Sequence, residues 1–441
     1  ALAILSVLGI YLLVLGLWHS VVAGVVAAAV FTSFKMYAHE ALVGPDGHTP
    51  GVVFLIFAMW LTVRRRWYWA GFAAALAFFS WQPLFPYPAI VLLCAVAWSP
   101  GHRWRAAIRN IAGGMTPFVI LIVYYAAEGY PGKLFEGTFL FPVRGTYRVP
   151  VAFGSRLHWI FRDIPRSYGS SATLLWIGLA LLLIEAVWTV ASAGSEWRAA
   201  VISPIILLVT LSLVAQVGYV LYDYIGWTHA FPLLPYGAIG FGAGTVRLLQ
   251  WVSRPSDARL VTSAALLAGA AALTGFYAVS YYQPTRDTAL LAQKAAACAI
   301  QRSLPQGTTL WSIDNPNPLV LLHRRNPDNY PYVGGGLATW RVKHTRHGFA
   351  GWTAQIRATA SIVAFQYWRE RIPIRARLEH WLTNHGYRKG YIGQWKVYVT
   401  HAAYIRMKSH SIRLTHKQQG WPLKTTGGIF RVTSCTKAVA E

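Results

Sequence analysis

The segment Lys35–Pro50, with the sequence KMYAHEALVGPDGHTP, carries side chains suited to acid–base chemistry. It lies between two apolar runs, and Glu40 and Asp46 are the only acids in the first hundred positions. A carboxylate at the edge of a membrane is costly to keep and usually serves a function. Glu40 and His39 are therefore candidates for a general base, a metal ligand or a group that orients a hydroxyl. The alternative is an ordinary connecting loop.

Two later junctions of apolar runs also carry side chains that could face a cavity. Trp81 and Gln82 end one run, and Asp223 and His229 lie between two others. We predict that these four residues line the same cavity as Glu40, although aromatic packing at a membrane interface explains them equally well. Glu185 lies inside an apolar run, where an acid is a functional candidate by default. It falls in the opposite half of its span and is left out of the predicted site.

The long segment Glu128–Ser171 is basic and aromatic. Arginine forks suit bidentate contacts with phosphate, and two of these arginines are four residues apart, so a helical turn would point both the same way. The predicted phosphate-binding residues are Arg144, Arg148, Arg156 and Arg162. The alternative is a solvated loop that contacts anionic lipid.

Signatures of soluble enzymes are missing from the sequence. It contains no phosphate-loop lysine motif, no dinucleotide-binding glycine fingerprint, no HExxH and no paired CxxC. Cys94, Cys298 and Cys435 lack metal-ligand spacing, and the last two could pair if the tail lies outside the cytoplasm. No metal site is predicted, and no cofactor is indicated.

The composition is that of a membrane protein. The chain has 441 residues, of which 55% are hydrophobic, and its mean hydropathy is +0.38. Several of its apolar runs are shorter than the ~20 residues that a spanning helix needs. About ten runs are predicted to span: Ala1–Leu17, Ser20–Phe34, Gly51–Val63, Tyr68–Ser80, Leu84–Trp98, Ile111–Ala126, Thr173–Val190, Ala200–Val220, Phe231–Val246 and Leu260–Tyr281.

The arginines of the short loops predict the orientation, because cytoplasmic loops are enriched in Lys and Arg. If every run crosses once, the arginines of these loops all fall on one side: Arg64, Arg65, Arg66, Arg103, Arg105, Arg109, Arg198, Arg247, Arg254 and Arg259. The C-terminal part then lies outside the cytoplasm. The net charge of +25 falls mostly after Tyr281. Beside membrane spans this charge favours anionic lipid headgroups or phosphorylated lipids over nucleic acid.

The pattern changes after Tyr281, where long apolar runs end. A transmembrane domain over 1–281, an extracytoplasmic α/β domain over 282–400 and a basic segment over 401–441 are predicted. The α/β domain is predicted from helices at Asp287–Leu304 and Trp368–Asn384 and from strands at Thr308–Ile313, Ser361–Phe365 and Lys396–Thr400.

Three stretches resemble the GT-C membrane glycosyltransferases, in particular the polyprenyl- or dolichyl-phosphate-mannose mannosyltransferases. AGFAAALAFFSWQPLFPYPAIV (Ala70–Val91) looks like their paired central helices, and YDYIGWTHAFPLLPYGAIGFG (Tyr222–Gly242) like their late outer junction. GYIGQWKVYVT (Gly390–Thr400) looks like the closing strand of their outer domain.

The resemblance implies an α-helical polytopic membrane protein of the cell membrane that transfers a sugar, mannose in the first instance, from a polyprenyl-phosphate donor to an acceptor outside the cytoplasm. It also implies a catalytic Asp in a first outer loop, which would lie before Ala1 in a longer chain. Glu40, with His39, matches the place of a second acidic residue. Two other classes stay open: a transporter or flippase of lipid-linked sugars, and a non-catalytic subunit of cell-envelope assembly.

Overall fold

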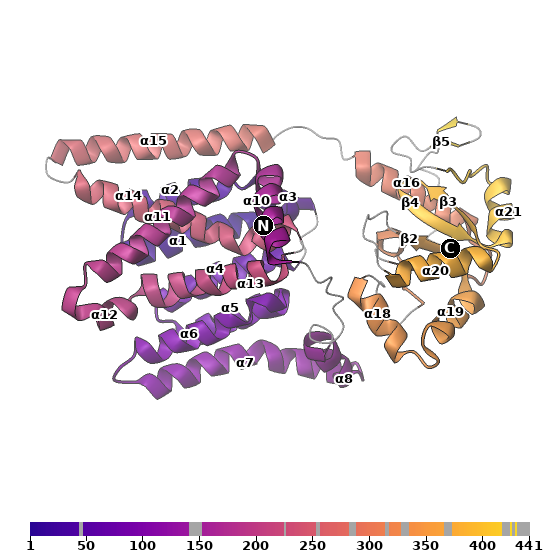
Figure 1. Ribbon diagram of the computed structural model, residues 1–441, viewed down its shortest axis with the longest axis horizontal. Helices are drawn as coiled ribbons and strands as arrows, with labels where there is room; N and C mark the ends of the chain where they lie inside the picture. The colour runs from indigo at the N-terminus through magenta and orange to yellow at the C-terminus, as the bar shows by residue number, and fades with distance from the viewer. Residues whose placement is uncertain are drawn as a thin grey trace. The chain divides into compact units, whose positions relative to one another are not determined.

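The computed structural model describes residues 1–43, 47–140, 152–224, 226–252, 256–281, 288–313, 317–327, 335–365, 373–416, 424–425 and 428–429. The chain divides into two compact units (Figure 1). The first comprises Ala1–Thr138 and Pro150–Gln283, and the second comprises Phe139–Val149 and Pro284–Glu441.

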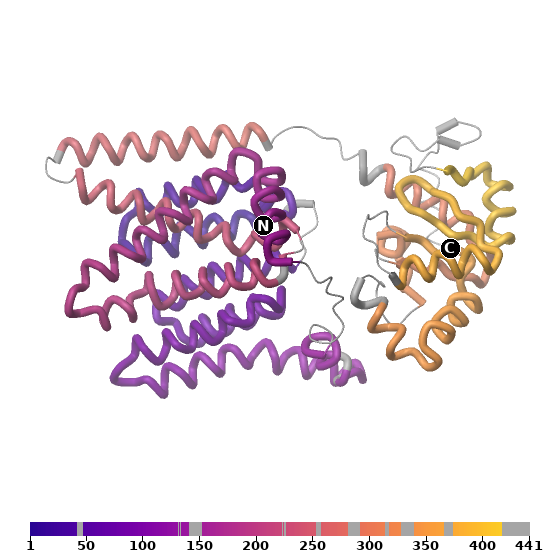
Figure 2. The backbone as a smooth tube through the Cα atoms, in the orientation of Figure 1, coloured from indigo at the N-terminus to yellow at the C-terminus, as the bar shows by residue number. Residues whose placement is uncertain are grey.

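The first unit is a bundle of helices, whose course can be followed in Figure 2. In chain order they are α1 (Leu2–Trp18), α2 (Val21–Thr32), α3 (Lys35–Val43), α4 (His48–Val63), α5 (Trp67–Ser80), η1 (Gln82–Leu84), α6 (Pro86–Ala97), α7 (Arg103–Ala127), α8 (Pro131–Phe135), η2 (Glu136–Leu140, which runs into the second unit), α10 (Phe153–Tyr168), α11 (Ser171–Ala191), η3 (Gly194–Glu196), α12 (Trp197–Val201), η4 (Pro204–Thr210), α13 (Leu211–Asp223), η5 (Trp227–Leu233), α14 (Leu234–Trp251) and α15 (Ser256–Tyr281). Within this unit α7 and α15 lie at opposite edges (Figure 1).

Helices long and apolar enough to cross a membrane are present in the described part of the first unit. There are four by length and composition: Arg103–Ala127, Ser171–Ala191, Pro204–Tyr222 and Asp257–Ser280. Val21–Thr32 and Lys35–Ala41 add a fifth if this pair, bent by 73°, forms one span. Other predicted runs form shorter apolar helices, such as α1 and α4. Length and composition alone therefore do not reach the ten predicted spans.

Glycines let the helix backbones of the bundle touch. A Cβ placed on Gly178 of α11 would lie 2.1 Å from the Gly237 carbonyl oxygen of α14, and one on Gly240 would lie 1.8 Å from that of Gly178. Between α5 and α7, a Cβ on Gly113 would lie 1.8 Å from the Tyr68 carbonyl oxygen. Small residues bring membrane helices together in this way, because lipid supplies little hydrophobic drive for their association.

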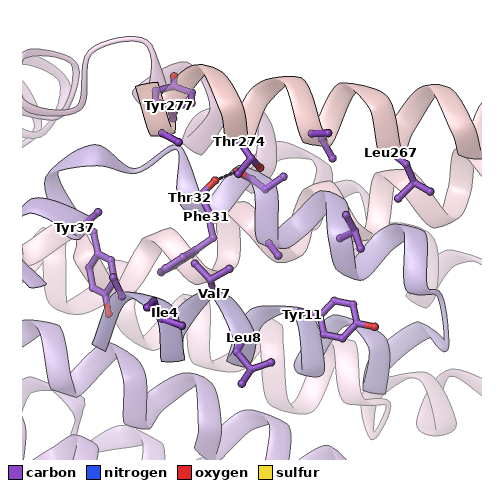
Figure 3. Close-up of a pocket in the computed structure, with 18 residues that line it drawn as sticks. Ile4, Val7, Leu8, Tyr11, Phe31, Thr32, Tyr37, Leu267, Thr274 and Tyr277 are labelled. Atoms are coloured by element: carbon purple, nitrogen blue, oxygen red, sulfur yellow. Dashed lines mark hydrogen bonds between the residues drawn. The ribbon is translucent and has the colours of Figure 1, made fainter. Parts of the chain in front are cut away.

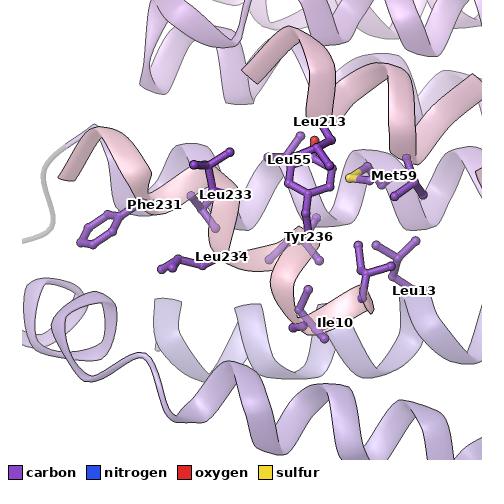
Figure 4. Close-up of a cluster of buried hydrophobic side chains, with 14 of the residues drawn as sticks. Ile10, Leu13, Leu55, Met59, Leu213, Phe231, Leu233, Leu234 and Tyr236 are labelled. Carbon is purple, nitrogen blue, oxygen red and sulfur yellow. The ribbon is translucent and has the colours of Figure 1, made fainter. Parts of the chain in front are cut away.

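The core of the bundle forms around the start of α14. Tyr236 is fully buried among apolar side chains of α1, α4 and α13, among them Leu13, Met59 and Leu213 (Figure 4). Its hydroxyl shares a 2.7 Å hydrogen bond with that of Tyr87 on α6. Buried hydroxyls therefore satisfy each other where the helices converge.

An ion pair joins α11 to α14. The Arg247 guanidinium of α14 donates from Nε and Nη2 to the Glu185 carboxylate of α11, at 2.6 and 2.8 Å. The Glu185 side chain is 7% exposed, and the guanidinium also lies 5.5 Å from the centre of the Trp188 ring. This bidentate contact compensates a buried charge that would otherwise be strongly destabilising. Glu185 therefore has a structural partner, in keeping with its omission from the predicted site.

The second unit contains a mixed sheet with the strand order β1-β2-β4-β3. β1 (Thr309–Ile313) pairs in parallel with β2 (Ala360–Phe365), whereas β4 (Trp395–Val399) pairs antiparallel with β2 and with β3 (Arg388–Ile392). The helices are α16 (Thr288–Ser303), α17 (Asn317–Leu321), α18 (Gly335–His344), α19 (Gly348–Thr359), α20 (Pro373–Asn384) and α21 (His401–Ser409), and β5 (Lys424–Thr425) and β6 (Gly428–Ile429) form a short ladder.

Alternate residues of the sheet enter two different cores, as the two-residue period of a strand requires. Ile362 and Val397 face the side covered by α16 and α21, whereas Val363 and Tyr398 face α19 and α20. α21 begins just beyond the predicted domain boundary at Thr400, yet its Ala403 and Met407 are fully buried in the first of these cores.

The strands predicted at 308–313, 361–365 and 396–400 are confirmed to within one residue, and so is the helix predicted at 287–304. The helix predicted to end at Asn384 does so, and Gly386 follows with a φ of 83°. Its predicted start, at Trp368, lies outside the described residues. β3 was not predicted, because its sequence RKGYI combines charges with a glycine that strands disfavour.

A charged network fastens α20 to the sheet. The Glu379 carboxylate accepts hydrogen bonds from Arg375 Nε at 3.1 Å, from the Tyr398 hydroxyl at 3.3 Å and from Lys396 Nζ. Burial by itself would raise the pKa of Glu379, but the Lys396 and Arg375 cations outweigh burial and lower this pKa below its ordinary value of 4.5.

We expect Gly178→Ala to destabilise the bundle, because its Cβ would meet backbone atoms that cannot move aside without separating α11 from α14. Overpacking of this kind costs about 1–3 kcal/mol. Gly218→Ala on α13 is the matched control, since a Cβ there meets nothing within 4 Å. Thermal unfolding of the two variants in detergent tests this contact between α11 and α14. Equal melting temperatures would show that the contact does not limit stability.

We expect Glu379→Gln to destabilise the α/β unit at neutral pH and to remove part of its acid sensitivity. Because the folded pKa of Glu379 is lowered, its carboxylate contributes fully above about pH 4.5 and loses this contribution as the pH falls through the folded value. Hydrogen exchange of β2 and β4 between pH 3 and 7 in the full chain measures the effect. A difference between variant and wild type that did not shrink toward low pH would contradict this role.

Candidate functional site

Four rings from four parts of the chain meet at one end of the bundle. Trp81, which follows α5, has its ring centre 4.5 Å from that of His48, 5.2 Å from Tyr219 and 5.5 Å from His229. The two imidazole centres are 5.3 Å apart, and His229 stacks on Tyr219 at 5.9 Å. We call His48, Trp81, Tyr219 and His229 the ring cluster. Its tryptophan is buried, whereas both imidazoles are half-buried.

A close backbone contact places His48 against Trp81. Gly47 caps the start of α4, and a Cβ on it would lie 2.2 Å from the carbonyl oxygen of Ser80, the last residue of α5. Only a glycine permits this approach, so the first side chain of α4 and the first side chain after α5 face each other. His229 enters from η5, a tight 3₁₀ segment that holds Pro232.

The segments that carry the ring cluster also hold buried polar atoms. Within the described residues no hydrogen-bond partner is found for Thr49 Oγ1, for the Tyr224 hydroxyl or for either amide atom of Gln216. Thr49 follows His48, the Tyr224 ring centre is 6.4 Å from that of His229, and Gln216 precedes Tyr219 by about one turn of α13. Buried polar groups are nearly always satisfied. These atoms are therefore candidates for binding a polar group that the described residues do not supply.

A second set of rings supports this end of the bundle. The Tyr37 hydroxyl of α3 lies 2.6 Å from Ser6 Oγ and donates to the Thr49 carbonyl oxygen at 3.2 Å. The Tyr37 ring packs edge-on against Phe231 of η5, at 5.2 Å between centres. Tyr168 of α10 donates to the Trp227 carbonyl oxygen at 3.0 Å. α1, α3, α10 and η5 are thereby tied together around the start of α4.

The helix α10 lies across this end through an apolar stripe and one arginine. Ile160, Ile164 and Tyr168 are buried at four-residue spacing, and Arg156 donates to the Leu221 carbonyl oxygen at 3.3 Å and to that of Tyr222. Arg156 therefore anchors α10 to the last turn of α13.

α10 also carries a charged pair near Tyr224. Arg162 Nε donates to Asp163 Oδ1 at 2.9 Å. Burial raises the pKa of the Tyr224 hydroxyl, the Asp163 carboxylate adds to this rise, and the Arg162 guanidinium opposes it. Both charges therefore lie within electrostatic reach of Tyr224, and Arg162 is placed where it could meet an anion bound beside the ring cluster.

The structure brings some of the predicted site residues together and places others apart. It joins Trp81 and His229 in the ring cluster, and Gln82 begins the short η1 directly after Trp81. Glu40 is half-buried and His39 exposed, both on α3. Asp223 ends α13, but its side chain is not described. Arg144 and Arg148 lie outside the described residues, and so does Cys435.

Sequence reasoning placed His48 in the candidate segment Lys35–Pro50 but gave it no role, and it did not single out Gln216, Tyr219 or Tyr224. A signal existed for Gln216 and Tyr219, since they lie three residues apart, and therefore on one face, in a mostly apolar helix. Among the described residues, no group of three His, Cys, Asp or Glu side chains could hold a metal ion.

Comparison with known proteins does not assign the chain to a family. Neither the protein-family models nor the curated proteins searched include a match to this sequence. The function is therefore argued from the residues themselves.

We expect Arg156→Met to loosen α10, because it removes both contacts with the end of α13 while keeping a long apolar stem. Hydrogen exchange should rise in α10 and around residues 221–224. Arg166→Met is the matched control on the same helix, at an exposed position. Equal exchange in the two variants would show that the apolar stripe alone holds α10.

Proposed function

We propose that the chain is a membrane glycosyltransferase that moves a sugar, mannose in the first instance, from a polyprenyl-phosphate donor to an acceptor outside the cytoplasm. The observation that carries this proposal is the ring cluster with its buried, unpartnered polar atoms. Pockets that bind small molecules combine aromatic walls with a few polar groups that fix orientation. A sugar ring presents hydroxyls to such groups and its C–H face to aromatic rings.

The proposal includes about ten membrane spans, with the ring cluster and the α/β unit on the non-cytoplasmic side. It is supported by the long apolar helices and by the arginines that gather between apolar runs at one set of helix ends. His48, Trp81 and His229 all belong to segments at the opposite ends of the helices from those arginines. On this topology the ring cluster lies at headgroup depth, where the phosphate of a lipid-borne donor is found.

The transfer needs one proton acceptor and stabilisation of one anion. The acceptor oxygen bonds to the anomeric carbon, the bond from that carbon to the phosphate oxygen breaks, and the lipid phosphate leaves with the electron pair. The hydroxyl proton passes to a base, and histidine is the side chain suited to this near neutral pH, so we assign it to His48 or His229. Glu40 and His39 on α3 would orient the acceptor. Arg162 would stabilise the departing phosphate, and Arg144 and Arg148, which lie outside the described residues, stay predicted phosphate-binding residues.

We expect His229→Gln and His48→Gln to lower kcat while the amount of folded protein stays unchanged. The variant that removes the histidine acting as the base should lower kcat by about 10²–10⁴-fold. The measurement is transfer of labelled mannose from polyprenyl phosphate to cell-envelope acceptors by the full chain in liposomes. His102→Gln is the matched control, because His102 is exposed just before α7. Unchanged kcat in both site variants would remove the ring cluster from the reaction. Movement of the lipid-linked sugar between leaflets without transfer would favour a flippase.

A further inference from the structure

A large apolar pocket lies between α1, α2 and α15 (Figure 3). Its volume is about 880 Å³, near the upper end of the ~300–1,000 Å³ typical of small-molecule sites. None of the side chains that line it is charged, and most are alanine, valine, leucine or isoleucine. α2 packs against both α1 and α15, and the pocket lies beside it between these two helices. A water-filled cavity of this character is disfavoured.

The pocket has the length of one leaflet. Along α15 its lining runs from Leu267 to Ala278, a rise of about 17 Å at ~1.5 Å per residue. That is roughly half of the ~30 Å hydrocarbon core of a bilayer. The pocket therefore suits a chain that enters from one surface and ends near the midplane, as an acyl chain of a phospholipid does.

A basic side chain marks the surface end of the pocket. The Lys35 ammonium donates to the Ser280 carbonyl oxygen at 3.4 Å, which joins the start of α3 to the end of α15. Tyr37 and Ala278, each two residues away from these partners, line the same end of the pocket. A cation beside the mouth of an apolar pocket at the membrane surface favours an anionic headgroup.

Tyr37 separates the pocket from the ring cluster. Its ring lines the pocket, is 1% exposed and packs on Phe231. Its hydroxyl is held by Ser6 and Thr49. A chain in the pocket is therefore walled off from the site at which we place the sugar.

We infer that this pocket is a binding site for a resident anionic phospholipid, whose acyl chain lies between α1 and α15 and whose phosphate lies beside Lys35. The inference rests on the membrane location proposed above but not on the transfer reaction. The ligand is distinct from the sugar donor because Tyr37 closes the way to the ring cluster.

The test compares two neighbouring substitutions on α15. Ala271 and Ala272 are both exposed, but Ala271 lines the pocket and Ala272 does not. The full-length variants Ala271→Phe and Ala272→Phe are delipidated in detergent and titrated with phosphatidylglycerol or with phosphatidylcholine of the same chains, and bound lipid is counted by native mass spectrometry. Ala271→Phe should bind phosphatidylglycerol at least tenfold more weakly than Ala272→Phe. Lys35→Gln leaves the pocket open. In this variant the ratio of the affinity for phosphatidylglycerol to that for phosphatidylcholine should fall about fivefold.

Each outcome decides the inference. Equal binding by the two α15 variants, or an unchanged headgroup preference in Lys35→Gln, would overturn it. Polyprenyl phosphate in excess should leave phosphatidylglycerol bound, and one-for-one displacement would assign the pocket to the donor instead. Lipid binding is measured without donor sugar or acceptor, so that a failed transfer assay leaves this result independent.

Discussion

Contact between helix backbones is the constraint on which the bundle depends. Lipid is as apolar as the side chains it surrounds, so helices gain little from burying leucine against each other and gain more from close approach. Gly178, Gly237 and Gly240 bring α11 onto α14, and Gly113 brings α7 onto α5. The same device, at Gly47, sets the start of α4 against the end of α5. The candidate site is thus built at a place where the packing of the bundle already requires a glycine.

The polar groups of the bundle fall into two classes. Glu185 and Arg247 satisfy each other through two hydrogen bonds, and Tyr87 and Tyr236 do the same. Gln216, Thr49 and Tyr224 instead hold buried atoms for which the described residues supply no partner. The first class stabilises helix contacts, whereas the second carries a cost that binding of a polar ligand would relieve. This difference separates structural polar residues from candidate functional ones more clearly than their position within an apolar run does.

The α/β unit follows the rules of a soluble domain. Its sheet buries both faces, and a charged network around Glu379 joins α20 to β4 on one of them. Three of its strands were predicted from short apolar runs such as SIVAF. A central strand has such a run because both of its faces are buried. The bundle adds close glycine contacts between helix backbones to its apolar core, whereas this unit packs helices on the two faces of a sheet.

The sequence by itself determined the apolar helices, the change to an α/β unit after Tyr281 and several of the strand positions, because these depend on local composition and period. It also singled out Trp81 and His229 as candidates, since polar and aromatic residues at the ends of apolar runs are conspicuous. Only the tertiary structure decided that these two side chains meet each other and His48. It alone assigned Arg156 to the carbonyl groups of α13. Such contacts join residues far apart in the sequence, Arg156 and Leu221 by 65 positions and Trp81 and His229 by 148, and they depend on helix packing that no local pattern encodes.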